Sequence, residues 1–426
     1  MRQHDVMLKV RCFTLPLIAL ASVMFSRLLV CVGVPSVVNF LHFSIVLSAA
    51  LLVFWQVRFC ASAKMVIVLV VILGCIVVSA IVNHAGIINV VLDFLLLTEP
   101  LLFLYLITST RWSNKSVEMF RFCLICIAAI HVAIAYFQWG VMGFVDDNVT
   151  GLFVGLGAAS HVAGAVALSA AIYFLAEPRP KTFTFKFLQV GIFSSVVILA
   201  DAKQVIAVFL AAAIALSLVN ARRFWDGFRL FVLAIVASVI VFIIANTVFP
   251  ELLIWVEKDR LITGITQKIS VFEIIAANFT SLLNWFFGLG PGHTVDRLGF
   301  LLPKYFGKLD LLGATISPVT AMVWDAQQGN YTSNTTTGSS MFSLFFSWVG
   351  VWGDLGFVGL SIYAYSWIFV WRNFTSDNHS RFLLLTVCIF GGVYSWMEEP
   401  GYMLFVMSLI GLIWQEKGLA SKAKIT

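Results

Sequence analysis

The chain has 426 residues, of which 61% are hydrophobic and only 11% are charged, and its formal net charge is +6. This polar surface is too small to cover a soluble body of that size, so a water-soluble globular protein is excluded. Apolar runs of about 17 to 25 residues, each able to cross roughly 30 Å of hydrocarbon, recur along almost the whole length. In lipid such runs are helical, because an open strand cannot pair its backbone groups. The sequence therefore predicts an all-α integral membrane protein.

The apolar runs predict about twelve transmembrane helices in one polytopic membrane domain over residues 1–426. A cytoplasmic N-terminus would place 19 of the 27 lysines and arginines on the cytoplasmic side, as the positive-inside rule requires. Both termini are therefore predicted to be cytoplasmic. The helices are expected near residues 12–33, 39–57, 65–83, 88–108, 118–140, 152–176, 186–200, 203–219, 228–247, 343–370, 382–396 and 400–415.

A long extracytoplasmic loop is predicted at about residues 250–341, before the last three helices. In its segment Lys268–Phe287, apolar residues recur at helical spacing with polar residues between them, which is typical of an amphipathic helix resting on the outer membrane surface. The turn Gly288-Leu-Gly-Pro-Gly292 then ends any helix. A tract rich in Ser, Thr, Asn and Gly, residues 329–340, is expected to be flexible or to cover a ligand.

The segment Ala200-Asp-Ala-Lys-Gln204 joins two apolar helices with almost no loop. Asp201 is predicted to cap the second helix, with Gln204 completing a capping box. Lys203 would then lie at the positive end of the helix dipole, a conflict of about 0.3–1 kcal/mol that an anionic ligand would relieve. Two interpretations stay open: Lys203 binds a phosphate, or it only pairs with Asp201.

The long loop carries six basic and seven acidic residues, so it has no net basic field. Anion binding there would depend on single cations, of which Lys268 and Arg297 are the candidates. Asp354, near the outer end of a late membrane helix, is a candidate either for chemistry or for hydrogen bonding between helices. The scattered histidines and the cysteines, which lie in or beside apolar runs, indicate neither a metal site nor a disulfide framework.

Several short motifs follow one another in a recognisable order. They are Thr150–Phe153 with Ser160–Gly164, then Ala200–Gln204, then Lys268–Glu273 with Gly288–Gly292, and last Gly353–Leu360. From about residue 147 to the C-terminus this order resembles the O-antigen polymerase and O-antigen ligase family, the Wzy-like membrane glycosyltransferases. The family's two arginines would be Lys203 and Lys268 here, which keep the charge and lose the bidentate guanidinium fork.

The resemblance implies a GT-C-like fold at the periplasmic face of the bacterial inner membrane. It also implies transfer of a growing glycan from undecaprenyl pyrophosphate to a sugar hydroxyl of another lipid-linked repeat unit, which would build O-antigen, capsule or exopolysaccharide. Pyrophosphate is a good leaving group, so Lys203, Lys268 and Arg297 would only need to hold it, without a metal or cofactor. Glu273, His293 or Asp354 would accept the proton of the acceptor hydroxyl.

The partners that the resemblance implies are the undecaprenyl-pyrophosphate-linked glycan, membrane lipid, and a chain-length regulator and flippase of the same pathway, with no nucleic acid. Two alternatives stay open. An O-antigen ligase would transfer the glycan to lipid A-core, but that branch has a histidine in the stretch that corresponds to residues 339–352, which contains none. A polysaccharide or lipid-linked-sugar transporter would fit twelve helices, yet no repeat is visible. The enzymatic interpretation predicts that Lys203 and Lys268 share a cavity.

Overall fold

A computed structural model describes residues 2–56, 63–110, 112–155, 158–176, 182–221, 258–333 and 343–423, and this part of the chain contains helices and no strand. Nine of its helices are long and apolar enough to span a membrane, as expected of an α-helical multi-pass membrane protein. They are α1 (Arg2–Cys31), α2 (Leu41–Gln56), α3 (Ala63–Asn83), α4 (Ile87–Thr108), α5 (Asn114–Gly140), α6 (Ala159–Ala176), α8 (Lys203–Asn220), α14 (Ser347–Asn373) and α16 (Pro400–Ala423).

Two shorter helices, α7 (Phe183–Leu199) and α15 (Asn378–Val393), match two more of the expected ones. The helix expected near residues 228–247 lies outside the described residues. The short 3-10 helix η1 (Ser36–Phe40) leads into α2, and η6 (Trp396–Glu398) leads into α16.

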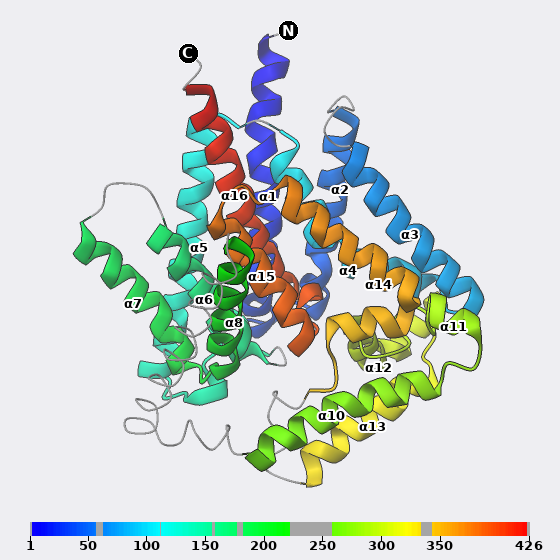
Figure 1. The fold of residues 1–426 in the computed structure, drawn as a ribbon. Helices are drawn as coiled ribbons and strands as arrows, with labels where there is room; N and C mark the ends of the chain where they lie inside the picture. The colour runs from blue at the N-terminus through cyan, green and yellow to red at the C-terminus, as the bar shows by residue number, and fades with distance from the viewer. Residues whose placement is uncertain are drawn as a thin grey trace.

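Figure 1 shows the beginning of α1 and the end of α16 at one end of the bundle, and α10 (Lys258–Ala277) and α13 (Pro318–Ser333) at the other. We call the first the terminal end and the second the loop end. This placement is what a chain with both termini on one side of a membrane requires. The core lies along α16, which packs on α4, α6, α5 and α1 and whose residues 402–407 are fully buried.

The amphipathic helix predicted over Lys268–Phe287 is two helices. α10 ends at Ala277, and α11 (Leu282–Phe287) begins after Ser281, whose hydroxyl accepts the N–H of Asn284 while the Asn284 side chain accepts the N–H of Ser281. Apolar residues recur at helical spacing on both sides of the break, so the sequence pattern did not indicate where the first helix ends. The turn predicted at Gly288 is confirmed, since α11 ends there with Gly288 at φ +70°. Of the tract at 329–340, the first part continues α13 to Ser333, and residues 334–342 are not described.

α14 is not one uninterrupted helix near residues 343–370, as the apolar run suggested. It begins at Ser347 and is interrupted at Gly356, which has φ +66° and ψ −166°. The interruption frees two carbonyl groups, and the turn after α11 uses them: Leu289 N–H donates to Gly353 O at 2.8 Å and Gly290 N–H donates to Asp354 O at 3.0 Å. The expected helix was wrong here because the break depends on a partner far away in the sequence.

Only glycine fits at this crossing of two backbones. A Cβ on Gly356 would lie 2.3 Å from the carbonyl carbon of Phe286, and a Cβ on Gly288 would lie 2.2 Å from that of Asp354. Both glycines also have positive φ, which side chains disfavour. The turn Gly288–Gly292 and the segment Gly353–Leu360, which are separate motifs in the sequence, are therefore in direct backbone contact.

Two other local predictions were wrong. α6 begins at Ala159 rather than near residue 152, because residues 150 and 151 form a turn whose N–H groups donate to the side-chain oxygen of Gln138. The capping box at Asp201 is absent: Asp201 has φ +47°, and Ala202 is the N-cap of α8 with no side-chain hydrogen bond. Asp201 instead pairs with Lys203 at 2.9 Å.

Candidate functional site

Three buried aspartates from three separate segments meet at the loop end. They are Asp93 in α4, Asp296 just before α12 (Arg297–Leu309) and Asp354 in α14, and one oxygen of each lies within 4.8 Å of those of the other two. Each residue is 1% exposed. The segment from Leu289 to Asp296 can lie against α14 because α14 has a glycine at the contact: a Cβ on Gly350 would be 2.5 Å from the Cα of Asp296.

Neighbouring donors hold two of these carboxylates. Asp354 accepts the N–H of Gly292 and the hydroxyl of Thr294, both at 2.5 Å. Asp296 caps α12 by accepting the N–H of Gly299 at 2.6 Å. One side-chain oxygen of Asp93 and one of Asp296 have no hydrogen-bond partner among the described residues. The cluster is thus fixed in position and keeps free acceptor capacity.

The cluster cannot be fully ionised, because like charges at such distances in a buried site repel one another. Burial raises the pKa of Asp296 to about 6, although the N–H of Gly299 opposes the rise. Burial, followed by the charge of Asp296, raises the pKa of the adjacent Glu398 in η6 to about 8, so this group is protonated at neutral pH. The site can store and release protons. Three carboxylate oxygens could also ligate a divalent cation, which the sequence did not predict.

Arg297 connects the aspartate cluster to a cavity. Its backbone N–H donates to Glu398 at 2.8 Å, and its guanidinium group forms an ion pair with Glu399, which is 4% exposed. Arg27, near the end of α1 at the loop end, is within electrostatic range of both Glu399 and Arg297. Two guanidinium groups that are far apart in the sequence, in α1 and α12, are therefore both influenced by the Glu399 carboxylate.

The cavity measures about 50 Å³ and lies between α1, η1, α12 and the start of α16. Its lining includes Arg27, His42, Arg297, Tyr305 and Glu399, and we call it the arginine cavity. The lining combines these polar and ionisable groups with apolar side chains such as Phe40, Phe43 and Leu96. Charged groups in such a setting interact more strongly than they would in water.

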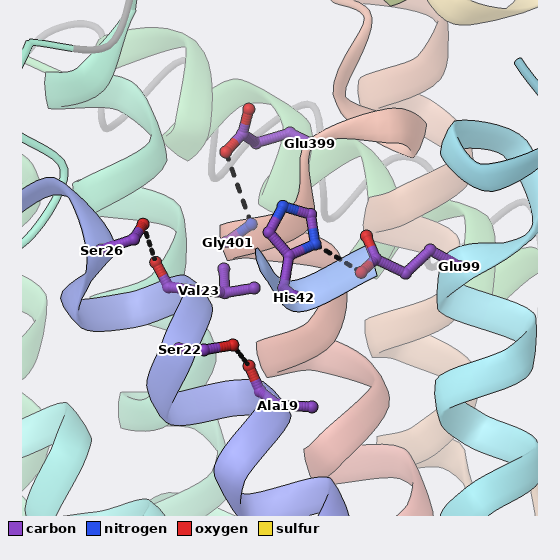
Figure 2. Close-up of polar contacts among 8 residues, drawn as sticks. All are labelled: Ala19, Ser22, Val23, Ser26, His42, Glu99, Glu399 and Gly401. Atoms are coloured by element: carbon purple, nitrogen blue, oxygen red, sulfur yellow. Dashed lines mark hydrogen bonds and ion pairs between the residues drawn. The ribbon is translucent and has the colours of Figure 1, made fainter. Parts of the chain in front are cut away.

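His42, the second residue of α2, is held by a buried carboxylate. Its Nδ1 lies 2.5 Å from an oxygen of Glu99 in α4. Figure 2 shows the imidazole between Glu99 and the turn of Glu399 and Gly401, with its second nitrogen facing away from Glu99. In that turn, Gly401 N–H donates to Glu399 at 3.4 Å. An imidazole oriented in this way by a carboxylate can accept a proton at its other nitrogen.

Lys268 and Lys203, the predicted pyrophosphate ligands, lie elsewhere at the loop end. The Lys268 ammonium donates to the carbonyl groups of Ser343 at 3.0 Å and Val393 at 2.8 Å, and burial lowers its pKa to about 8. Lys203 pairs with Asp201 and is within electrostatic range of His161. The ring centroids of His161 and Tyr394 are 6.1 Å apart. Neither lysine lines the arginine cavity. Their shared cavity stays a prediction.

The remaining predicted residues do not form a single site. Asp354 belongs to the aspartate cluster, and Arg297 links that cluster to the arginine cavity. Glu273 is exposed on α10. His293 is buried, with Nδ1 donating to Leu289 O at 2.8 Å and Nε2 accepting the Thr315 hydroxyl at 2.9 Å, and burial lowers its pKa. Because both ring nitrogens are engaged, His293 would have to break a hydrogen bond before it could act as a base.

Sequence reasoning missed four ionisable residues of this site. They are Arg27, His42, Asp93 and Glu99, all within apolar runs of the first four helices. The available signal was the free-energy cost of placing an ionisable side chain in a membrane helix, which makes such a residue a functional candidate by default. No motif drew attention to them, and the resemblance begins only at about residue 147.

No protein-family model matches this chain, and no curated protein matches it either. Its function must therefore be argued from the chemistry of the site together with the order of the motifs.

Proposed function

We propose that this protein is a membrane glycosyltransferase that lengthens a surface polysaccharide. It would transfer a glycan from undecaprenyl pyrophosphate to a sugar hydroxyl of another lipid-linked repeat unit. The observation that carries the proposal is the arginine cavity, where two guanidinium groups and a carboxylate-held imidazole converge at the loop end. These are the two functions that displacement of a pyrophosphate requires: a cationic site for the leaving group and a base for the nucleophile.

The proposed reaction uses each of these groups once. The acceptor hydroxyl oxygen attacks the anomeric carbon of the donor, and the bond from that carbon to the phosphate oxygen breaks. Pyrophosphate leaves with the electron pair and is stabilised by Arg27 and Arg297, whose planar groups can bind it in bidentate fashion. The proton of the hydroxyl passes to the free nitrogen of His42. Glu99 stabilises the imidazolium that forms, as a carboxylate does in a catalytic triad.

Glu399 pairs with Arg297 and is within electrostatic range of Arg27, so an incoming anion would compete with it for the two guanidinium groups. Its neighbour Glu398 already holds a proton at neutral pH, so the entering pyrophosphate would displace one carboxylate rather than two. In this proposal Lys203 and Lys268 attract the anionic substrate at the same end of the bundle. Metal-independent catalysis follows if the guanidinium groups neutralise the charge by themselves.

The proposed membrane arrangement has about twelve spans with both termini in the cytoplasm and a GT-C-like fold. The loop end then faces the periplasm of a bacterial cell with an inner membrane. O-antigen ligation is a less favoured variant, because the stretch before Gly353 lacks the histidine of that branch.

One observation favours a second candidate function. The aspartate cluster brings three buried carboxyl groups together inside the bundle, and intramembrane carboxylates of this kind often belong to proton relays of transporters. A proton-coupled transporter of lipid-linked sugars would use Asp93, Asp296 and Asp354 as its carrier site. The twelve-helix plan is compatible with both functions.

Surface polysaccharide on gels from cells that carry single variants separates these functions. In a host deleted for the gene, we expect Arg297→Ala to abolish the long-chain ladder and leave single-unit glycan, with the same direction for Arg27→Ala. Lys308→Ala, a cation removed from the exposed end of the same helix α12, is the matched control and should leave the ladder unchanged. Variants Lys203→Ala and Lys268→Ala should shorten the ladder if these cations guide substrate.

The other patterns on the gel identify the alternatives. Polymer that is made but stays on its lipid carrier would indicate ligation. Accumulation of lipid-linked units on the cytoplasmic side would indicate transport. A normal ladder from Arg297→Ala, with the variant present at wild-type level in the membrane, would refute the proposed pyrophosphate site.

A further inference from the structure

A second cavity at the loop end has a different chemistry from the arginine cavity. It measures about 410 Å³, within the range of roughly 300–1,000 Å³ that is usual for small-molecule sites. We call it the amide cavity after its polar lining, which comprises Asn83, His84, Asn278, His293, Thr315 and Ser317. None of the described residues that line it is Asp, Glu, Lys or Arg.

The amide and hydroxyl groups of this lining carry no charge and can both donate and accept hydrogen bonds. Asn278 gives one amide N–H to Ile274 O at 2.8 Å, and its side-chain oxygen has no partner among the described residues. His293 is uncharged at neutral pH, because burial lowers its pKa and its hydrogen bonds suit the neutral ring. Such groups match sugar hydroxyl and acetamido groups, which are also donors and acceptors without charge.

The walls of the amide cavity are built firmly. Thr315 is held by Asn89, whose side chain accepts the Thr315 N–H and donates to the Thr315 carbonyl, both at 3.0 Å. The rim residue His84 has φ +55°, a left-handed conformation that is unfavourable for a non-glycine residue. Strain of this kind persists where the surrounding structure requires it, and it is concentrated at functional sites.

The amide cavity is coupled to the aspartate cluster through one turn of the chain. His293 lies between Gly292 and Thr294, and both of these residues hydrogen-bond the side chain of Asp354. A ligand that presses on His293 therefore acts on the segment that positions Asp354 and leads into Arg297. The same segment thus leads from the amide cavity at His293 to the arginine cavity at Arg297.

We infer that the amide cavity binds uncharged sugar residues of the substrate glycan, an inference that rests on the proposed transferase function. The arginine cavity would take the pyrophosphate and the amide cavity the sugars. The contrast between a charged and a neutral cavity at the same end of the bundle is the observation that assigns these roles.

The test measures binding without turnover, so that it is independent of the reaction. The probe is the repeat-unit oligosaccharide of the host's own polysaccharide, cleaved from its lipid and added to the full chain in lipid nanodiscs. Saturation-transfer NMR reports which sugars touch the protein, and titration gives the dissociation constant. We expect millimolar or tighter binding with the strongest contacts on neutral sugars. Asn278→Ala should raise the dissociation constant about three- to tenfold, as loss of one hydrogen bond does.

The chain offers a closely matched control. Asn373 also donates its amide N–H to the carbonyl group four residues earlier, Phe369 O, at 2.8 Å, but it lies at the end of α14 away from the cavity. Asn373→Ala should therefore lose the same intrahelical bond and leave oligosaccharide binding unchanged. Undecaprenyl pyrophosphate without sugar should bind wild type and Asn278→Ala equally.

Three results would overturn the inference: no binding of the oligosaccharide at millimolar concentration, equal affinity of wild type and Asn278→Ala, or strongest contacts on a charged sugar. Failure of the transferase proposal looks different. In that case the ladder survives Arg297→Ala, whatever the oligosaccharide does in the nanodisc.

Discussion

Replacing Glu398 by Gln tests the buried acid cluster quantitatively. Glu398 is 2% exposed, and one of its oxygens has no hydrogen-bond partner among the described residues. Burial and the charge of Asp296 raise its pKa from 4.5 to about 8. The folded state therefore binds more protons than the unfolded chain between these pH values. The stabilising effect of that proton is complete below about pH 4.5 and is lost as the pH rises through 8.

The magnitude follows from the same two pKa values. At about 1.4 kcal/mol per pH unit, ionisation of Glu398 costs at most about 5 kcal/mol of folding free energy. Glutamine imitates the protonated group and cannot ionise. We therefore expect Glu398→Gln to resemble wild type near pH 5 and to be more stable than wild type near pH 8.5.

Thermal unfolding in detergent between pH 5 and 9 measures this difference. Wild type should lose stability between about pH 5 and 8, and Glu398→Gln should lose less, with Asp296 contributing the remaining slope around pH 6. Glu273→Gln, at an exposed position on α10, is the matched control and should keep the wild-type slope. Parallel curves for wild type and Glu398→Gln would refute the argument that a proton resides on this carboxyl group.

Three further changes test other parts of the structure. Gly356→Ala should lower the unfolding free energy by about 2 kcal/mol or more, because φ +66° disfavours a side chain and the new Cβ would lie 2.3 Å from a backbone atom. Gly74→Ala, where a Cβ has open space around it, is the control and should keep the wild-type stability. Equal melting temperatures of the two variants would contradict the break in α14. His42→Gln should slow polymer formation in nanodiscs about 10²- to 10⁴-fold while pyrophosphate binding persists, and an unchanged rate would exclude a role as base. Wild type should gain stability between about pH 8 and 10.5, because burial lowers the pKa of Lys268 to about 8, and Lys268→Met should abolish that gain in thermal unfolding. A gain that survives this substitution would assign it to another group.

The helices were predictable because an apolar run of about 20 residues is a local property of the chain. Interruptions were not, because they depend on distant partners. The break at Gly356 lies where the N–H groups of Leu289 and Gly290 donate hydrogen bonds to carbonyl groups of α14. The break after α10 was missed for a different reason: its signal, Ser281 capping α11, is local but lies inside an uninterrupted apolar pattern.

The candidate site was predictable in part. Asp354 was named because ionisable residues at a membrane boundary are costly, and Arg297 was named as a single cation of the long loop. The structure places them at the aspartate cluster and its adjoining cavity. Arg27, His42 and Glu99 could not be grouped with them from the sequence. They belong to N-terminal helices without a motif, and only the packing of α1, α2 and α4 around the start of α16 brings them to Arg297.

Direct binding of undecaprenyl pyrophosphate to the purified protein in nanodiscs tests the central proposal most directly. A charge-assisted hydrogen bond contributes about 1.5–3 kcal/mol, so Arg27→Ala and Arg297→Ala should each weaken binding about 10- to 100-fold relative to wild type and to Lys308→Ala. Unchanged affinity in both arginine variants would show that the lipid pyrophosphate does not enter the arginine cavity.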